Sequence, residues 1–175
     1  MNAYILKKIS PLQLHILDNM LQLYAHDINK YFQYPVRMDD NGRYRVRSAE
    51  KNLSDGWGYF IMVSCEYAGF VLLNHKTKAQ EGVFISEFFL LPRYRKGSFF
   101  KTVIATLFST LEGTVEYRIL KKNKRALAVF VDLAKRFIKD YQTIDEQEYG
   151  EEYHRFTFDM SNLAYDVRKY KTHVK

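Results

Sequence analysis

A single carboxylate interrupts an apolar stretch near the middle of the chain. Glu87 lies within the run from Val83 to Leu91, whose other residues are almost all hydrophobic. Such a run predicts a central strand that is covered on both faces. A carboxylate there loses hydration, which raises its pKa and suits it to accept a proton from an amine near neutral pH. Glu87 is therefore predicted to be a general base, and the equal alternative is a structural carboxylate paired with a cation such as Arg118.

A basic cluster follows this strand and surrounds the start of a predicted helix at Ser98. It consists of Arg93, Arg95, Lys96 and Lys101. A helix N-terminus offers free N–H groups and a favourable dipole to an anion, and the Ser98 hydroxyl suits the capping position. The net charge of +7 attracts anionic partners in general, but it does not choose among nucleotides, RNA and acidic substrates. A basic run can also be only a solvated surface.

Several other polar residues allow both a functional and a structural interpretation. His26 and Asp27 lie on the first predicted helix, either to orient an acceptor group or as a surface pair. Asn123 opens a later helix, where its amide either contacts a ligand or only caps the helix. Glu116 and Arg118 share one face of a strand by its two-residue period, so they are expected to form a structural ion pair.

No metal site is predicted. The five histidines and the single cysteine show no spacing typical of metal ligands. Cys65 lies in an apolar strand pattern and is expected to be a small buried hydrophobic residue.

Helices and strands alternate along the chain. Ser10 and Pro11 mark the start of a long first helix, in which apolar residues recur at spacings of three and four. Residues 33–56 predict a loop with a short helix at 49–53. The remaining segments predict strands at 59–65, 69–74, 83–91, 115–120 and 153–158, a hairpin turn at 66–68, and helices at 98–111 and 124–139.

These elements predict an α/β (α+β) fold, with a mixed and mostly antiparallel sheet flanked by helices. The 175 residues fit one domain, expected over 1–160, followed by a basic C-terminal tail over 161–175. The chain shows no signal peptide and no apolar run of about 20 residues, which predicts a cytoplasmic protein without membrane contact. It is expected to be a monomer or a homodimer.

Four sequence blocks resemble a known superfamily. They are Leu23 to Asp27, Glu87 to Phe89, Glu116 to Arg118 and Asn123 to Ala126, in this order along the chain. Together with the strand, loop and helix from Ile85 onward, they resemble the GNAT superfamily of acyl-CoA N-acyltransferases, and in particular a branch of predicted acetyltransferases. The resemblance runs from about Leu12 to Phe158.

The resemblance implies transfer of an acyl group from acetyl-CoA or another acyl-CoA to a small-molecule or peptide amine. In such a reaction, Glu87 or a water chain is expected to take the amine proton, and no metal cofactor is expected. Tyr24, His26 and Asp27 would border the acceptor. The implied cofactor-binding residues are Leu90, Leu91, Arg93, Arg95, Lys96, Gly97, Ser98, Phe99, Phe100, Lys101 and Asn123.

The chain departs from the superfamily at two points. In the loop pattern Arg-x-x-Gly-x-Gly, Arg95 matches the arginine, but Ser98 and Phe100 occupy the two glycine positions. Phe130 occupies the position at which many of these enzymes place a tyrosine that protonates the leaving thiolate. Two alternatives therefore stay open: a catalytically inactive binding module with a filled cleft, and an acyltransferase that acts with tRNA. If the loop still binds acyl-CoA, Phe100 is expected to face the buried side of its helix, and Arg95, Lys96 or Lys101 to converge on one anion.

Overall fold

The computed structural model describes residues 4–78, 81–96 and 98–163. In this part of the chain, seven strands form one sheet in the order β1-β2-β3-β4-β5-β7-β6. The strands are β1 (Tyr4–Lys8), β2 (Gly56–Val63), β3 (Glu66–Asn74), β4 (Val83–Leu90), β5 (Thr114–Leu120), β6 (Gln142–Glu148) and β7 (Glu151–Asp159). The helices are α1 (Leu14–Asn29), α2 (Ala49–Ser54), α3 (Phe99–Phe108) and α4 (Lys124–Phe137).

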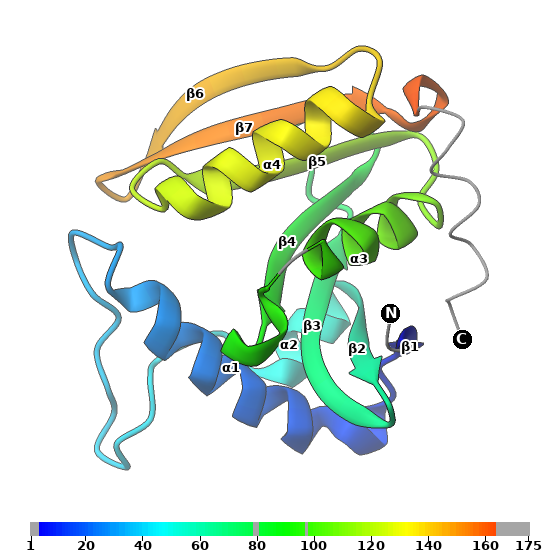
Figure 1. Cartoon of the computed structure of the whole chain (residues 1–175). Coiled ribbons are helices and arrows are strands. Elements are labelled where there is room, and N and C mark those ends of the chain that lie inside the picture. Colours follow the sequence, from blue (N-terminus) through cyan, green and yellow to red (C-terminus); the bar gives the residue numbers. More distant parts are fainter. Residues whose placement is uncertain (1–3, 79–80, 97, 164–175) are drawn as a thin grey trace.

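Neighbouring strands in the described sheet run antiparallel, except for the central pair β4 and β5, which is parallel. This is the mixed, mostly antiparallel α/β fold expected from the sequence. Helices cover both faces of the sheet (Figure 1). On one face, α3 and α4 pack against all the central strands, and on the other, α1 and α2 cover β2, β3 and β4. The predicted central strand is therefore confirmed as β4.

The first helix begins as the sequence predicts. Pro11–Gln13 forms a 3-10 turn, and the Gln13 side chain accepts a hydrogen bond from the Ser10 N–H at 3.3 Å. α1 continues from there and buries one face through Leu17, Met20 and Leu21. The apolar spacing thus places α1 against the sheet.

The hairpin between β2 and β3 differs from the prediction. Its turn is at Ser64 and Cys65, which adopt positive φ angles of 49° and 67°, rather than at residues 66–68. Two residues with positive φ match the right-handed twist of the flanking strands. Cys65 is exposed at this tip, so the expectation of a buried cysteine was wrong.

Two edge strands were missed. β1 pairs with β2 and buries Tyr4 and Leu6. β6 pairs with β7, but most of its side chains are exposed and polar, so it lacks an apolar alternation. The fold also includes Leu163, which is buried and forms a bridge with Ile138. The basic residues expected in the tail, Arg168 onward, lie outside the described residues.

Candidate active site

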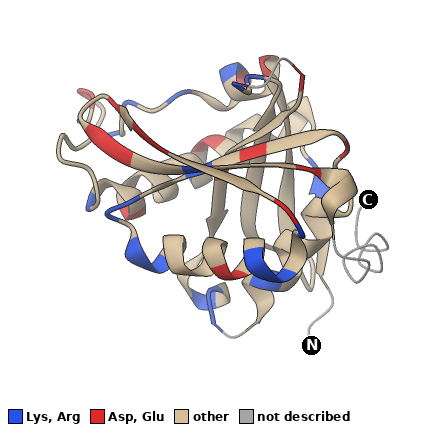
Figure 2. Cartoon of the chain, turned by 90° about the horizontal axis from the view of Figure 1, so that it is seen from above, with Lys and Arg blue, Asp and Glu red and all other residues tan. Residues whose placement is uncertain are grey.

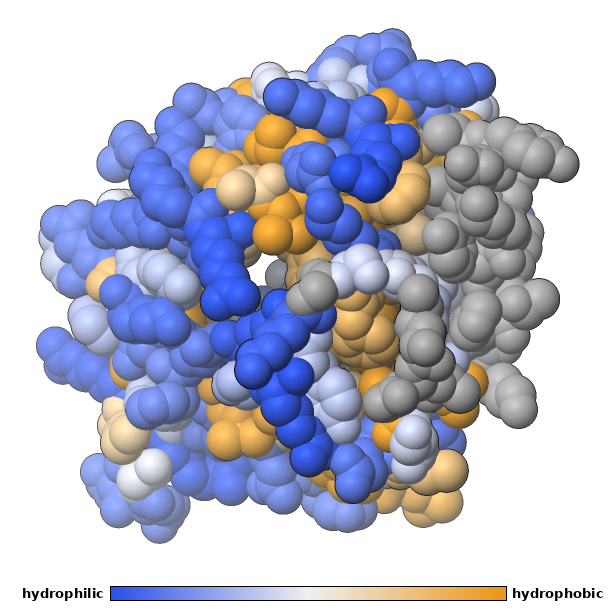
Figure 3. Space-filling model, in the orientation of Figure 1, coloured by the Kyte–Doolittle hydropathy of each residue, from blue (hydrophilic) through white to orange (hydrophobic). Residues whose placement is uncertain are grey.

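The central parallel strands separate after a short stretch of pairing. The ladder between β4 and β5 joins Val83, Phe84 and Ile85 to Val115, Glu116 and Tyr117, and the pairing ends there. The remaining residues of both strands line a cavity of about 570 Å³, which lies in the size range of small-molecule sites. Figure 3 shows a hollow in this face of the molecule, rimmed by hydrophilic side chains with apolar surface beside it. α1, α3 and α4 complete the cavity wall.

A β-bulge sets the direction of Glu87. In the ladder with β3, Leu73 pairs with Ile85 and Leu72 pairs with Glu87, so that Ser86 is the extra residue. The Ser86 hydroxyl donates a hydrogen bond to the Leu72 carbonyl at 3.1 Å. Without the bulge, Glu87 would follow Ile85 by two residues and point to the α3 and α4 side. The bulge turns Glu87 to the α1 side, as bulges beside functional sites commonly redirect a side chain.

Glu87 is a poorly hydrated carboxylate. Burial raises the pKa of Glu87 to about 7, although a hydrogen bond with the Tyr24 hydroxyl and the charge of Arg118 partly offset this rise. Burial and the neighbouring carboxylate also raise the pKa of Tyr24 well above its ordinary value, so Tyr24 stays protonated. A carboxylate that titrates near pH 7 can accept a proton from a nucleophile at neutral pH.

The residues predicted to bind the cofactor divide into two groups. Those that line the cavity are Leu90, Arg95, Lys96, Phe100, Lys101 and Asn123. Leu91, Arg93, Ser98 and Phe99 are not among the lining residues, and Gly97 lies outside the described residues. Phe99 packs against Tyr4 and Tyr94, and Arg93 forms an ion pair with Glu66. Asn123 also caps α4, because its side-chain oxygen accepts a hydrogen bond from the Ala126 N–H at 3.1 Å.

The loop cations do not converge on one position. Arg95 pairs with Asp27 at 2.8 Å and donates to the Leu90 carbonyl at 2.6 Å. Lys101 pairs with Asp132 on α4. The predicted convergence of cations is therefore not what the structure shows. Neither α3 nor α4 carries an acidic residue in its first turn, and α4 begins with Lys124 and Arg125. Together the two helix N-termini leave positive potential at this end of the cavity.

Phe100 both packs and lines the cavity. Its ring makes edge-on contacts with Phe88 at 4.8 Å and with Phe130 at 5.3 Å between centroids. It therefore joins β4 to α4 beneath the cleft, on the α3 and α4 side of the sheet. The expectation that Phe100 packs on the buried side of its helix holds, but the ring also forms part of the cavity wall.

The three residues predicted to bind the acceptor are placed differently. Tyr24 and Asp27 line the cavity from α1. His26 is exposed, and its Nδ1 lies 3.0 Å from the Tyr44 hydroxyl, outside the cavity. The interpretation of His26 as a surface residue therefore fits its position.

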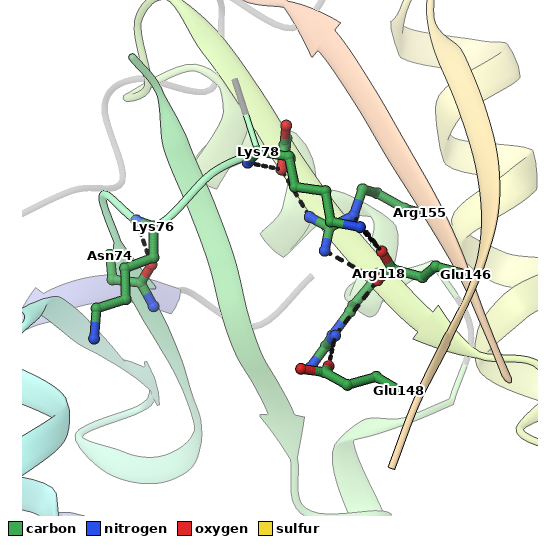
Figure 4. A network of polar contacts seen from close by, with 8 residues as sticks. Asn74, Lys76, Lys78, Arg118, Glu146, Glu148 and Arg155 are labelled. Atoms are coloured by element: carbon green, nitrogen blue, oxygen red, sulfur yellow. Dashed lines mark hydrogen bonds and ion pairs between the residues drawn. The ribbon is translucent and has the colours of Figure 1, made fainter. Parts of the chain in front are cut away.

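Sequence reasoning missed Arg118 and Tyr31 as cavity residues. It also paired Glu116 with the wrong partner. Glu116 binds Arg155 at 2.7 Å, whereas Arg118 binds Glu148 and Glu146 on β6 (Figure 4). The partners of Arg118 lie on β6, which gave no apolar signal, whereas the Glu116–Arg155 pair joins β5 to β7. The strand period did correctly place Glu116 and Arg118 on one face.

A buried carboxylate ties the segment after α1 to the far half of the sheet. Glu151 opens β7, is only 4% exposed, accepts a hydrogen bond from the Gln33 N–H and pairs with Lys122 at 3.0 Å. Although burial opposes it, these bonds hold the pKa of Glu151 below its ordinary value. The stabilisation from ionised Glu151 is therefore fully present above the pKa of a glutamate in the unfolded chain. It is lost as the pH falls through the lower pKa that Glu151 has in the folded protein.

Glu151→Ala is expected to release this segment. Because two hydrogen bonds to a buried charged group disappear, limited proteolysis within residues 33–47 should become about tenfold faster. Glu152→Ala is the matched control, since Glu152 is adjacent but exposed. Equal cleavage rates in the two variants would show that Glu151 does not hold the segment.

Comparisons with known proteins identify the fold. No protein-family profile and no curated protein sequence matches the chain. Among solved structures, an acetyltransferase from Thermus thermophilus superposes with a TM-score of 0.64 at 9% identity, covering 91% of this chain and 99% of that one. Spermidine N-acetyltransferase from Vibrio cholerae, in complex with CoA and spermine, gives a TM-score of 0.63 at 11% identity, with 91% and 96% covered. A GNAT family acetyltransferase from Bacillus cereus gives 0.57 at 12% identity, with 89% and 96% covered.

The chain therefore has the fold of the GNAT superfamily of acyl-CoA N-acyltransferases. Within the described residues, no helix is long and apolar enough to cross a membrane, and no group of three His, Cys, Asp or Glu side chains is placed to hold a metal ion. Basic and acidic residues are interspersed along the described part of the chain (Figure 2).

Proposed function

We propose that this protein is an N-acyltransferase that moves an acyl group from acetyl-CoA or another acyl-CoA to an amine. The observation that carries the proposal is the position of Glu87, a carboxylate with a pKa near 7 in the cavity between the diverging strands β4 and β5. The two helix N-termini and the cations Lys96 and Arg125 suit the phosphates of the donor. The donor would then lie on the α3 and α4 side and the acceptor on the α1 side.

The reaction needs one proton acceptor and one proton donor. The amine nitrogen attacks the thioester carbonyl, Glu87 takes the amine proton directly or through water, and the carbon–sulfur bond breaks to release the CoA thiolate. Phe130 cannot protonate this thiolate. The tyrosines whose side chains line the cavity, Tyr24, Tyr31 and Tyr117, are the candidate donors.

The acceptor amine would bind on the α1 side of the cavity, which Tyr24, Asp27 and Tyr31 line together with Glu87. A small amine or the amino group of a peptide fits such a site. Because one structural neighbour was solved with spermine, polyamines are the first amines to test, followed by amino acids and peptides. We also expect a cytoplasmic protein that acts as a monomer or homodimer.

Calorimetry with acetyl-CoA and longer acyl-CoA thioesters tests donor binding, and release of free CoA thiol in the presence of each amine tests transfer. Binding followed by amine-dependent thiol release supports the proposal. Binding without release for any amine would indicate the inactive binding module. Absence of acyl-CoA binding, with retention of tRNA that falls steeply with salt, would indicate a tRNA-dependent function instead.

Phe100→Gly tests the substituted loop. Removing the ring opens the cavity floor and lets the start of α3 approach a phosphate closely, so the Kd for acetyl-CoA should fall by about tenfold. The thermal midpoint should also fall, because the contacts with Phe88 and Phe130 are lost. Phe99→Gly is the control, since it has the same helix penalty but its ring lies outside the cavity. Equal acetyl-CoA affinity in both variants would contradict this role of Phe100.

A further inference from the structure

The guanidinium of Arg118 shares the cavity with Glu87. Arg118 follows Tyr117, the last residue of β5 that pairs with β4. Tyr117 points to the α3 and α4 side, so Arg118 points to the opposite side, to which the bulge also directs Glu87. Both side chains line the cavity from the two strands that diverge.

Arg118 is fixed by contacts from three strands. Its Nη1 donates to Glu148 and, at 3.4 Å, to Glu146, both on β6. Its guanidinium lies 4.4 Å from the centroid of the Tyr153 ring on β7 and 6.0 Å from that of Phe84 on β4. Figure 4 shows Arg118 between the two glutamates. A planar cation held on one edge and stacked on an aromatic ring keeps a defined orientation.

The Glu146 carboxylate behind Arg118 stays ionised near neutral pH. Although burial opposes it, hydrogen bonds from Arg155 and Lys78 lower the pKa of Glu146 to about 2. Glu146 is thereby shared with these two other cations. The contact of Arg118 with Glu146 is therefore maintained while Glu87 titrates.

Several of the other charged groups that line the cavity are paired with one another. Asp27 on α1 and Arg95 in the loop after β4 neutralise each other at 2.8 Å. Tyr24 from α1 and Tyr153 from β7 are uncharged, because the pKa of each is raised by burial. Lys101 is paired with Asp132. Among the cations that line the cavity, Arg118 is the one whose charge lowers the pKa of Glu87.

We propose that Arg118 is a positioning residue: its guanidinium, held by Glu148, keeps the Glu87 carboxylate ionised in the cleft so that it can accept a proton at neutral pH. The role in proton transfer rests on the proposed function, but the electrostatic effect on Glu87 does not. Arg118 would act through Glu87, without contact with the thioester.

The test measures the titration of Glu87 directly, by carbon-13 NMR of its side-chain carboxyl group in the full chain. In Arg118→Met the burial of Glu87 is no longer offset by a positive charge, so its titration midpoint should rise by about one pH unit. Arg118→Lys retains the charge and should restore most of the wild-type midpoint. Arg125→Met removes a cavity arginine at the start of α4 and should leave this midpoint unchanged. Arg118→Gln supplies a second neutral side chain if the methionine variant does not fold.

The pH profile of kcat/KM gives the functional readout. A base works when deprotonated, so a higher Glu87 pKa moves the rising limb of the profile to higher pH and lowers kcat/KM at pH 7 by about fivefold. An unchanged Glu87 midpoint in both neutral variants would overturn the proposal, whatever the activity. A raised midpoint in a protein that transfers no acyl group would support the effect of Arg118 on Glu87, and it would contradict the proposed function and the proton-transfer role together.

Discussion

Glu87→Gln is expected to lower kcat/KM for acyl transfer by about 10²–10⁴-fold while the Kd for acyl-CoA stays close to that of the wild type. Glutamine preserves the shape of the side chain and its hydrogen bonding with Tyr24, but it cannot accept the amine proton. Because Glu87 lies on the α1 side of the cleft and the phosphates are expected near α3 and α4, donor binding does not depend on it.

The pH dependence separates this role from a structural one. In the wild type, the rate should rise with pH through an apparent pKa near 7, the value at which Glu87 becomes deprotonated. In Glu87→Gln this limb should disappear, leaving only the ionisation of the amine acceptor. Glu50→Gln, at an exposed position on α2, is the control and should keep the limb. A Glu87→Gln enzyme that retains wild-type kcat/KM, or the same limb, would show that another group accepts the proton.

The stability consequence of Glu87 has the opposite sign from its catalytic use. Its folded-state pKa lies above that of an unfolded glutamate, so the folded protein binds a proton more tightly than the unfolded chain between about pH 4 and pH 7. Stability attributable to this group is therefore greatest at acid pH and declines as the pH rises toward 7. Such a cost is typical of catalytic positions.

The sequence predicted the framework of the site because its elements carry strong local signals. β4 is a continuous apolar run, and α1 and α4 have clear apolar faces. The single carboxylate in β4 was therefore recognisable from its apolar neighbours. The position of Asn123 as a helix cap also followed from its residue type.

The direction of Glu87 could not be predicted, since it depends on the bulge at Ser86. Side chains of a strand alternate between its two faces, and here both sets are apolar: Phe84 and Phe88 in one set, Ile85 and Phe89 in the other. The sequence pattern therefore does not indicate which face Glu87 belongs to. A bulge shifts the alternation of side chains between the two faces of the sheet by one residue. Only the pairing with β3 shows where this occurs.

The partners of Arg118 could not be predicted for a different reason. β6 has the sequence Gln142–Glu148, almost entirely polar, and as an edge strand it buries little. Its role is to supply Glu146 and Glu148 to the part of the α1 side of the sheet, over β5, β6 and β7, that α1 itself does not cover. Ion pairs between residues distant in sequence leave no periodic signal, so Glu116 was assigned to its neighbour in the strand.

The same face holds the interaction with the largest expected effect on stability. Arg155 is 6% exposed, and it donates to Glu116 at 2.7 Å and to both oxygens of Glu146 at 2.9 and 3.0 Å. Its guanidinium also lies 5.3 Å from the centroid of the Phe84 ring. Glu116 is 2% exposed and accepts a further hydrogen bond from the Lys78 N–H. Arg155 therefore neutralises two carboxylates that water reaches poorly.

Arg155→Met should lower the free energy of unfolding by about 3–5 kcal/mol, because Glu116 and Glu146 lose their shared cation in a site of low hydration. For a chain of this length the thermal midpoint should fall by about 10 °C. Arg136→Met is the matched control: Arg136 lies on α4, is exposed, and pairs with Asp132 at 3.7 Å, so the thermal midpoint should change little.

In the double variant Glu116→Met with Arg155→Met, one of the two carboxylates is removed together with the cation, so its thermal midpoint should lie above that of Arg155→Met alone. If the two substitutions instead lower stability by the sum of their separate effects, Arg155 and Glu116 are not energetically coupled, and the stability of this face comes from its packing on Phe84.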